Sequence, residues 1–209
     1  MAQRKERADA LRNRESVLAA ADALLARSDD PRGVSMDEVA AAAGVGKGTL
    51  FRRFGDRAGL ISAVIGARLE PLLERVREAD REDQGDGEGD GERAAGAAPS
   101  PRQRVRSLLD AVLLFKIENR RLMSVAEDAG ISSPYQAEHY VSWHEALAGA
   151  LRHVPGVSHP DFTAHALLSA VRADLVTHLV DGLGTPPDEL RAALAAQVNA
   201  ILGPEAGDR

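Results

Sequence analysis

The stretch SMDEVAAAAGVGKGTLFRRFG, residues 35–55, restricts the fold of this chain more than any other. Ser35 is followed three residues later by Glu38, a capping-box spacing that starts a helix. Gly44 suits the left-handed residue that ends a helix, and Gly46 can cap the helix that follows. The pattern predicts two short helices joined by a tight turn near residues 44–46.

The letters GVGKGT, residues 44–49, can also be interpreted as the phosphate-binding loop of a nucleotide kinase. Such a loop follows a buried strand and opens a long helix. Here it follows MDEVAAAA, a capped helix with two acids, and only five residues separate Thr49 from Gly55. We therefore interpret the stretch as a helix-turn-helix and keep the kinase as the alternative.

Apolar residues in this stretch are spaced so that its two helices can cross and share a core. They are Val39, Ala43, Val45, Leu50 and Phe54, with the small Ala40 where the helices approach. The second helix, about 46–54, is too short to be stable alone, so packing must hold it. Its outer face is then free to carry Lys47, Thr49, Arg52 and Arg53.

Apolar residues recur at helical spacing along the rest of the chain. Aromatic residues make up only 3% of the composition, so the core should consist of aliphatic helix faces. An all-α fold is predicted, with further helices at about 8–26, 57–79, 105–117, 137–151, 164–179 and 190–202 and a shorter segment at 122–130. Pro71 lies inside one of them and must kink or split it; we expect a kink.

Residues 81–101, REDQGDGEGDGERAAGAAPSP, are acidic and rich in glycine. They offer little apolar surface to bury, so a flexible loop is expected. Asp86, Glu88 and Asp90 have the spacing of a calcium loop, but Ala97 stands where the closing carboxylate belongs. We interpret the stretch as a solvated linker.

Charge divides the chain into two parts. Residues 1–68 contain 12 Lys or Arg and 9 Asp or Glu, whereas residues 69–209 contain 14 and 23. Only the N-terminal part is expected to meet a polyanion. The chain has no Cys, no secretory signal and no apolar run of membrane-spanning length, so we expect a cytoplasmic protein without disulfides or thiolate metal sites.

The segment SMDEVAAAAGVGKGTLFRRFGDRAGLISAV, with a long helix on either side, resembles the DNA-binding signature of the TetR family of bacterial transcriptional regulators. The resemblance covers about residues 12–66. It implies a three-helix DNA-binding domain at 1–68, joined by a long helix to a helical effector-binding and dimerisation domain at 69–209. Phe51, Gly46 and Arg57 depart from the residues that the family often has there, which are Tyr, Ser and Lys.

The resemblance also implies a homodimer whose recognition helices enter successive major grooves of a roughly palindromic operator. The expected DNA-contacting residues are Ser35, Lys47, Gly48, Thr49, Phe51, Arg52, Arg53 and Arg57. Lys47 and Arg52 suit base edges, while Ser35, Thr49, Arg53 and Arg57 suit phosphates. A basic tail with Arg4, Lys5 and Arg7 could add a minor-groove arm, although such tails are more often simply solvated.

The C-terminal domain is expected to bind a small-molecule effector and to dimerise through its last two helices. Candidate effector contacts are His144 and His178, which are polar groups on otherwise apolar faces, and the nearby Trp143 and Arg172. A satisfied core histidine is an equal alternative, and a metal site of His139, His144, His165 and His178 is less favoured because no i, i+4 His pair occurs.

The predicted function is that of a ligand-responsive repressor, with neither a catalytic group nor a cofactor. A TetR-like activator without effector control remains the alternative within this class. The effector would change the distance between the DNA-binding heads, with the helix at 57–79 as the lever and Pro71 as its flexing point.

Overall fold

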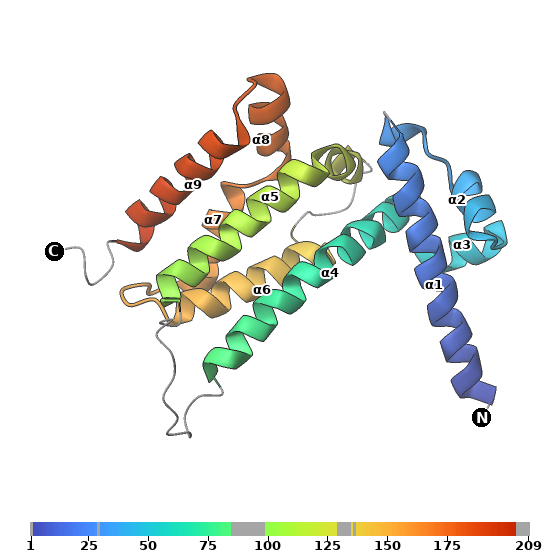
Figure 1. The fold of residues 1–209 in the computed structure, drawn as a ribbon, viewed down its shortest axis with the longest axis horizontal. Coiled ribbons are helices and arrows are strands. Elements are labelled where there is room, and N and C mark those ends of the chain that lie inside the picture. The colour runs from blue at the N-terminus through green and yellow to red at the C-terminus, as the bar shows by residue number, and fades with distance from the viewer. Residues whose placement is uncertain (1, 29, 85–98, 129–134, 136, 204–209) are drawn as a thin grey trace, which may run out of the picture. The chain divides into compact units, whose positions relative to one another are not determined.

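A computed structural model describes residues 2–28, 30–84, 99–128, 135 and 137–203 of the chain. Within these ranges the chain forms helices and turns and no strand, which confirms the predicted all-α fold (Figure 1). It divides into two compact units, Met1–Arg68 with Arg121–His139 and Leu69–Arg120 with Tyr140–Arg209.

The first unit begins with α1 (Ala2–Arg27), which packs on α2 (Met36–Ala43). The 3-10 turn η1 (Pro31–Gly33) joins these two helices, and α3 (Lys47–Phe54) and α4 (Arg57–Gln84) follow. Buried residues of all four helices form one aliphatic core: Val17, Ala21, Leu25, Met36, Val39, Ala40, Leu50, Leu60, Ile61, Val64 and Ile65. Because α1 begins at Ala2, the basic residues expected in a tail or minor-groove arm are helical.

Side-chain caps mark where α2 and α4 begin, and a glycine marks where α2 ends. The cap at Ser35 and the turn at Gly44 were predicted. The Ser35 N–H donates to the Glu38 carboxylate at 2.8 Å, and the Glu38 N–H donates to the Ser35 hydroxyl at 3.2 Å. Gly44 has φ 67°, in the left-handed region where a glycine carries no steric cost. Asp56 accepts the N–H of Gly59 at 2.8 Å and so caps α4.

The predicted loop at 81–101 is shorter at both ends in the structure. Helix α4 continues through Pro71 without splitting and ends at Gln84, and α5 (Pro101–Asp128) begins at the loop's last residue. Ser100 starts α5 with a second reciprocal cap, in which it exchanges 2.8 Å and 3.2 Å hydrogen bonds with Gln103. Residues 85–98 lie outside the described part of the chain.

The second unit consists of the C-terminal part of α4 and most of α5, with α6 (Glu138–Arg152), α7 (Pro160–Ser169), α8 (Ala173–Thr177), the π-turn η3 (His178–Gly182) and α9 (Pro187–Leu202). The predicted stripe on α5 is buried throughout, at Val105, Leu108, Leu109, Val112, Leu113 and Ile117. The segment at 122–128, expected to be separate, continues α5.

The single helix predicted at 164–179 is wrong, because the chain breaks after α7. The N–H groups of Ala170 and Val171 turn back to Leu167 and Leu168, and Arg172 is extended with ψ 144°. The guanidinium of Arg172 then pairs with Asp174, an acid in the first turn of α8 where the helix dipole favours it. After this new start Leu175, a member of the predicted apolar stripe, is 38% exposed. The apolar spacing in the sequence therefore runs across a break in the helix.

Candidate nucleic-acid interface

Helix α3 presents a basic outer face and holds itself to the first unit by a few apolar residues. Leu50 is 1% exposed, whereas Lys47, Gly48, Arg52 and Arg53 are exposed and Thr49 is half-buried. Phe51 is 40% exposed, a large share for an aromatic ring. The predicted DNA-contacting residues of α3 therefore lie where a ligand outside the unit can reach them.

The cap residue of α3 offers its backbone amides no side-chain acceptor. Gly46 is extended, with φ −68° and ψ 139°, and contributes no capping side chain. Gly48 in the first turn has open space where a Cβ would lie. A helix N-terminus of this kind carries partial positive charge and exposed N–H donors, both of which favour phosphate.

Lys47 is held by two neighbours within the unit. Its ammonium lies 2.7 Å and 2.8 Å from the two carboxylate oxygens of Asp37 on α2. The same ammonium lies 6.0 Å from the centre of the Phe51 ring, at the outer limit of a cation–π contact. The residue expected to read bases is thus already positioned by a carboxylate, a partner that the sequence analysis missed.

The remaining arginines differ in what they bind inside the unit. Arg53 donates to the carbonyl of Ala10 on α1. Arg57 is half-buried and donates to the carbonyls of Val34, at 2.9 Å, and of Pro31. Arg57 therefore ties α4 to the loop before α2, and Arg52 presents the more accessible guanidinium.

The sequence GVGKGT forms the turn between α2 and α3 and the first residues of α3. Helix α2 occupies the place where a phosphate-binding loop requires a strand, and Gly44 forms the turn out of it. The N–H of Val45 donates to Ala40 at 3.0 Å, which closes the turn on the helix that it leaves. The glycines therefore serve a helix-turn-helix.

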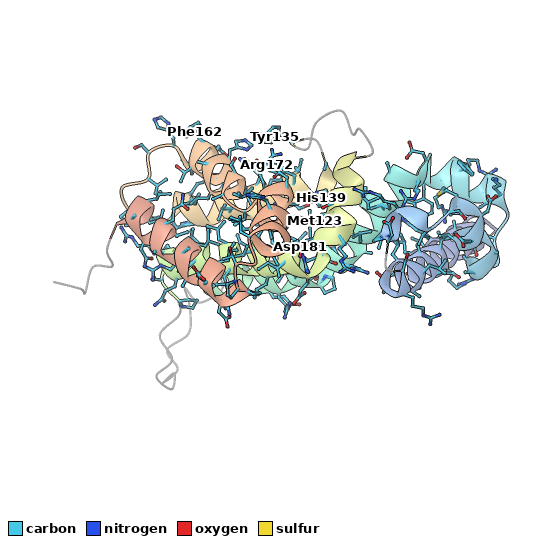
Figure 2. All side chains as sticks on the ribbon, turned by 90° about the horizontal axis from the view of Figure 1, so that it is seen from above. Met123, Tyr135, His139, Phe162, Arg172 and Asp181 are labelled. Carbon is cyan, nitrogen blue, oxygen red and sulfur yellow. The ribbon has the colours of Figure 1, made fainter. Side chains whose placement is uncertain are left out.

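The four residues proposed for the effector site have different surroundings in the second unit. Trp143 is 2% exposed and meets Phe115 edge to face at 6.3 Å. Arg172 (Figure 2) pairs with Asp174 and lowers the pKa of that carboxyl, mainly through their hydrogen bond. His178 is exposed on η3. Among the described contacts, none joins any two of the four.

His144 belongs to a stack of rings on α6 and α7. Its ring centre lies 4.0 Å from that of His165, and the Tyr140 hydroxyl lies 2.7 Å from Nδ1 of His165. The Nε2 atom of His144 lies 3.1 Å from the Asp161 carbonyl. This is the arrangement of a histidine that is satisfied within the fold.

Two buried polar residues on α5 escaped the sequence analysis. Lys116 and Asn119 are each 7% exposed, and the Asn119 amide donates to the Phe115 carbonyl at 2.8 Å. Helical spacing could have found Lys116, which follows the buried Val112 by four residues. Charged groups are rarely buried, so the burial of Lys116 is unusual.

An open cleft of about 390 Å³ lies between α5 and α9. Its walls combine the apolar Leu194 and Val198 with a double hydrogen bond between Asp110 and Arg191, at 2.7 Å and 2.8 Å. The hydrogen bonds to the Asp110 carboxylate, and its charge, raise the pKa of Arg191. None of the residues proposed for the effector lines this cleft.

Helix α9 has one buried apolar face and an exposed face that mixes alanines with polar side chains. Leu190, Leu194, Val198 and Leu202 are buried, whereas Ala196 and Ala200 are exposed, as are Gln197 and Asn199. Leu183, just before α9, is 64% exposed, and Phe162 at the start of α7 projects outward with 75% exposure (Figure 2).

In the described part of the chain, no helix is both long and apolar enough to cross a membrane.

Comparisons with known proteins agree with this geometry. Residues 17–64 match the family described as "Bacterial regulatory proteins, tetR family". A comparison with curated proteins gave no match. Solved structures show the same fold over nearly the whole chain.

Three of these structures illustrate the likeness. A protein from Rhodococcus sp. that was assigned to the TetR family has a TM-score of 0.55 and 21% identity, over 91% of this chain and 99% of its own. A TetR transcriptional regulator from Rhodococcus sp. RHA1 has a TM-score of 0.55 and 17% identity, over 97% and 100%. A third, from Mesorhizobium loti, has a TM-score of 0.53 and 17% identity, over 92% and 96%. At these identities they show the fold alone.

Proposed function

Since this chain is a TetR-family DNA-binding transcription regulator, we propose that it is a cytoplasmic repressor that a small molecule releases from its operator. The observation that carries the DNA-binding part is α3, whose basic face and uncapped N-terminus are both exposed. Hydrogen bonds to exposed amides and cations suit phosphates, while side chains on the same helix suit base edges.

We propose a division of the DNA contacts among these residues that follows from what each of them already binds. Lys47 and Arg52 are the better base readers, and the α3 amides near Gly48 suit a phosphate. Arg53 and Arg57 already donate hydrogen bonds to backbone carbonyls of the unit. Fewer of their N–H donors therefore remain for a phosphate. Ser35, Thr49 and Phe51 complete the proposed surface.

We propose a homodimer that pairs the outer faces of the C-terminal helices. The alanines of α9 would let two copies of that helix approach closely, and burial of Leu183 would add apolar contact. Two copies of α3 would then read a roughly palindromic operator, one half-site each.

Selection from a random pool of DNA duplexes tests the DNA-binding part. The protein should enrich a two-fold symmetric sequence, and a mobility shift should then show salt-dependent binding to it. An ATP-binding assay runs beside it, since nucleotide binding without DNA selection would favour the kinase alternative. A reporter driven by the selected operator separates repression from activation.

The effector site is proposed near Trp143, which is the only tryptophan in the chain. Because this ring is 2% exposed and contacts Phe115, a small molecule that enters nearby should change its fluorescence. Candidate molecules that change the signal are then tested for release of operator DNA. Substitution of His144, Arg172 or His178 by Ala should weaken the binding of the effector and leave the affinity for operator DNA unchanged.

We propose α4 as the lever between effector and DNA, with Pro71 as its flexing point. Proline removes one backbone hydrogen bond from the helix interior, which lowers the cost of bending there. Pro71→Ala should therefore reduce the change in operator affinity that the effector causes. An unchanged effector response would count against the lever.

A further inference from the structure

We propose that Asp37 is a specificity residue, which turns Lys47 from a phosphate-attracting cation into a hydrogen-bond donor reserved for base edges. The inference rests on the proposed DNA contact of α3. It concerns the one predicted base-reading side chain that the structure finds already paired with an acid, on the neighbouring helix.

The geometry of the pair leaves Lys47 with a donor to spare. Both carboxylate oxygens of Asp37 lie within hydrogen-bond distance of the ammonium, at 2.7 Å and 2.8 Å. An ammonium has three N–H donors, so one remains for another acceptor. The side chains are 60% and 62% exposed, so a DNA base edge can approach the pair without displacing other protein groups.

Asp37 is distinct from the other acid in the same turn of α2. Glu38 is committed to the Ser35 cap, and hydrogen bonds from the Ser35 backbone and side chain lower its pKa. Asp37 has no such role in the cap and faces α3. A cation in the first turn of α3 also opposes that helix's dipole, and the nearby carboxylate offsets this.

Pairing cancels the charge of Lys47 and leaves it one N–H donor for another acceptor. A neutral ion pair releases no DNA counterion, so it adds nothing to the sequence-independent attraction that dominates non-specific binding. It can still donate to guanine O6 or N7 in the major groove. The ratio of operator affinity to non-specific DNA affinity then rises, because the affinity for other sequences stays low.

The test compares Asp37→Asn with Asp22→Asn, which breaks another ion pair of the same unit, the half-buried pair of Asp22 with Arg68 at 2.6 Å. Both variants remove one carboxylate, so they match in net charge. Each is titrated across about 50–200 mM salt with the selected operator duplex and with a scrambled duplex of the same composition. Asp37→Glu keeps a carboxylate beside Lys47, and thermal unfolding checks that every variant folds.

Asp37→Asn should bind the scrambled duplex about three- to tenfold more tightly than wild type, with a salt slope steeper by up to about one unit per subunit. Operator affinity should change less, so the specificity ratio falls. Asp37→Glu should keep the wild-type slope. In a Lys47→Gln background, Asp37→Asn should have no further effect on the scrambled duplex.

Three outcomes would overturn the inference: equal slopes for Asp37→Asn and Asp22→Asn, equal gains on both duplexes, or an Asp37→Asn effect that persists without Lys47. If wild type selects no DNA sequence, the proposed function fails and the inference with it. If wild type selects an operator and only the Asp37 effect is missing, the inference alone fails.

Discussion

At the scale of single residues, Arg52 and Arg57 show that two cations five positions apart can have separate tasks. Arg52 is exposed on α3, whereas Arg57 is half-buried and bonds to two backbone carbonyls. Sequence reasoning assigned both to DNA, because an exposed and a structural arginine have the same signature in a sequence. Only the fold reveals that the carbonyls of Val34 and Pro31 lie within reach of Arg57.

We predict that the two alanine variants lose different properties, one its stability and the other its operator affinity. Arg57→Ala should lower the free energy of unfolding by about 1–3 kcal/mol, because hydrogen bonds from a charged donor are lost. Arg52→Ala should leave stability within about 0.5 kcal/mol and cost about 1–3 kcal/mol of operator binding, with relaxed preference at one base pair. Urea denaturation and operator titration measure the two effects. Equal losses of stability would contradict the division.

Ser35 is predicted to stabilise the fold through its cap in a pH-dependent way. Ser35→Ala should lower the free energy of unfolding by about 0.5–2 kcal/mol at neutral pH. The pKa of Glu38 in the folded protein is lowered from 4.5, so the stabilisation from its ionised hydrogen bonds is complete above that value. It is lost as the pH falls through the lower folded-state pKa.

Urea denaturation of wild type and Ser35→Ala at several pH values between neutral and acid tests this. The difference between the two proteins should narrow on acidification. Ser28→Ala provides the control, since the Ser28 hydroxyl donates to a backbone carbonyl and involves no carboxyl group. A gap that widens with acid would contradict the role given to Glu38.

At the scale of elements, the turn between α2 and α3 depends on backbone conformation at one glycine. Gly44 has φ 67°, whereas Gly46 has φ −68°, and neither is crowded where a Cβ would lie. Gly44→Ala should therefore lower the free energy of unfolding by about 1–2 kcal/mol. Gly46→Ser should raise it by a few tenths, because serine caps a helix slightly better than glycine.

Thermal unfolding of the two variants measures the difference. A destabilised Gly46→Ser would show that the α3 N-terminus needs the bare backbone for another reason. The start of α2 and this turn were predictable from sequence, because caps and glycine turns are local signals. The break between α7 and α8 was not, because Val171 is buried in phase with Leu167 and Leu168 and the apolar spacing runs through it.

At the scale of the whole molecule, the two units differ in how far the sequence determined them. The first unit has a short, specific motif that fixes three helices and their shared core. The second has only periodicity, which predicted the buried stripe on α5 and that on α9 except for Ile201, which is 48% exposed. It predicted neither the α5–α9 cleft nor the surroundings of Trp143 and His144. Those depend on which helices become neighbours, and that information is not local.

The last prediction concerns assembly, because the proposed operator has two half-sites and needs two copies of α3. Ala196 lies at the centre of the exposed face of α9, opposite the buried Leu194 and Val198. Wild type should sediment as a dimer of 22.2 kDa chains, and Ala196→Glu should sediment as a monomer, because two carboxylates would be buried face to face. Operator affinity should fall at least about tenfold, although the α3 of each monomer is unchanged.

Ala19→Glu, on the exposed side of α1, adds the same charge and should leave the dimer unchanged. A dimer that survives Ala196→Glu would place the interface on another face.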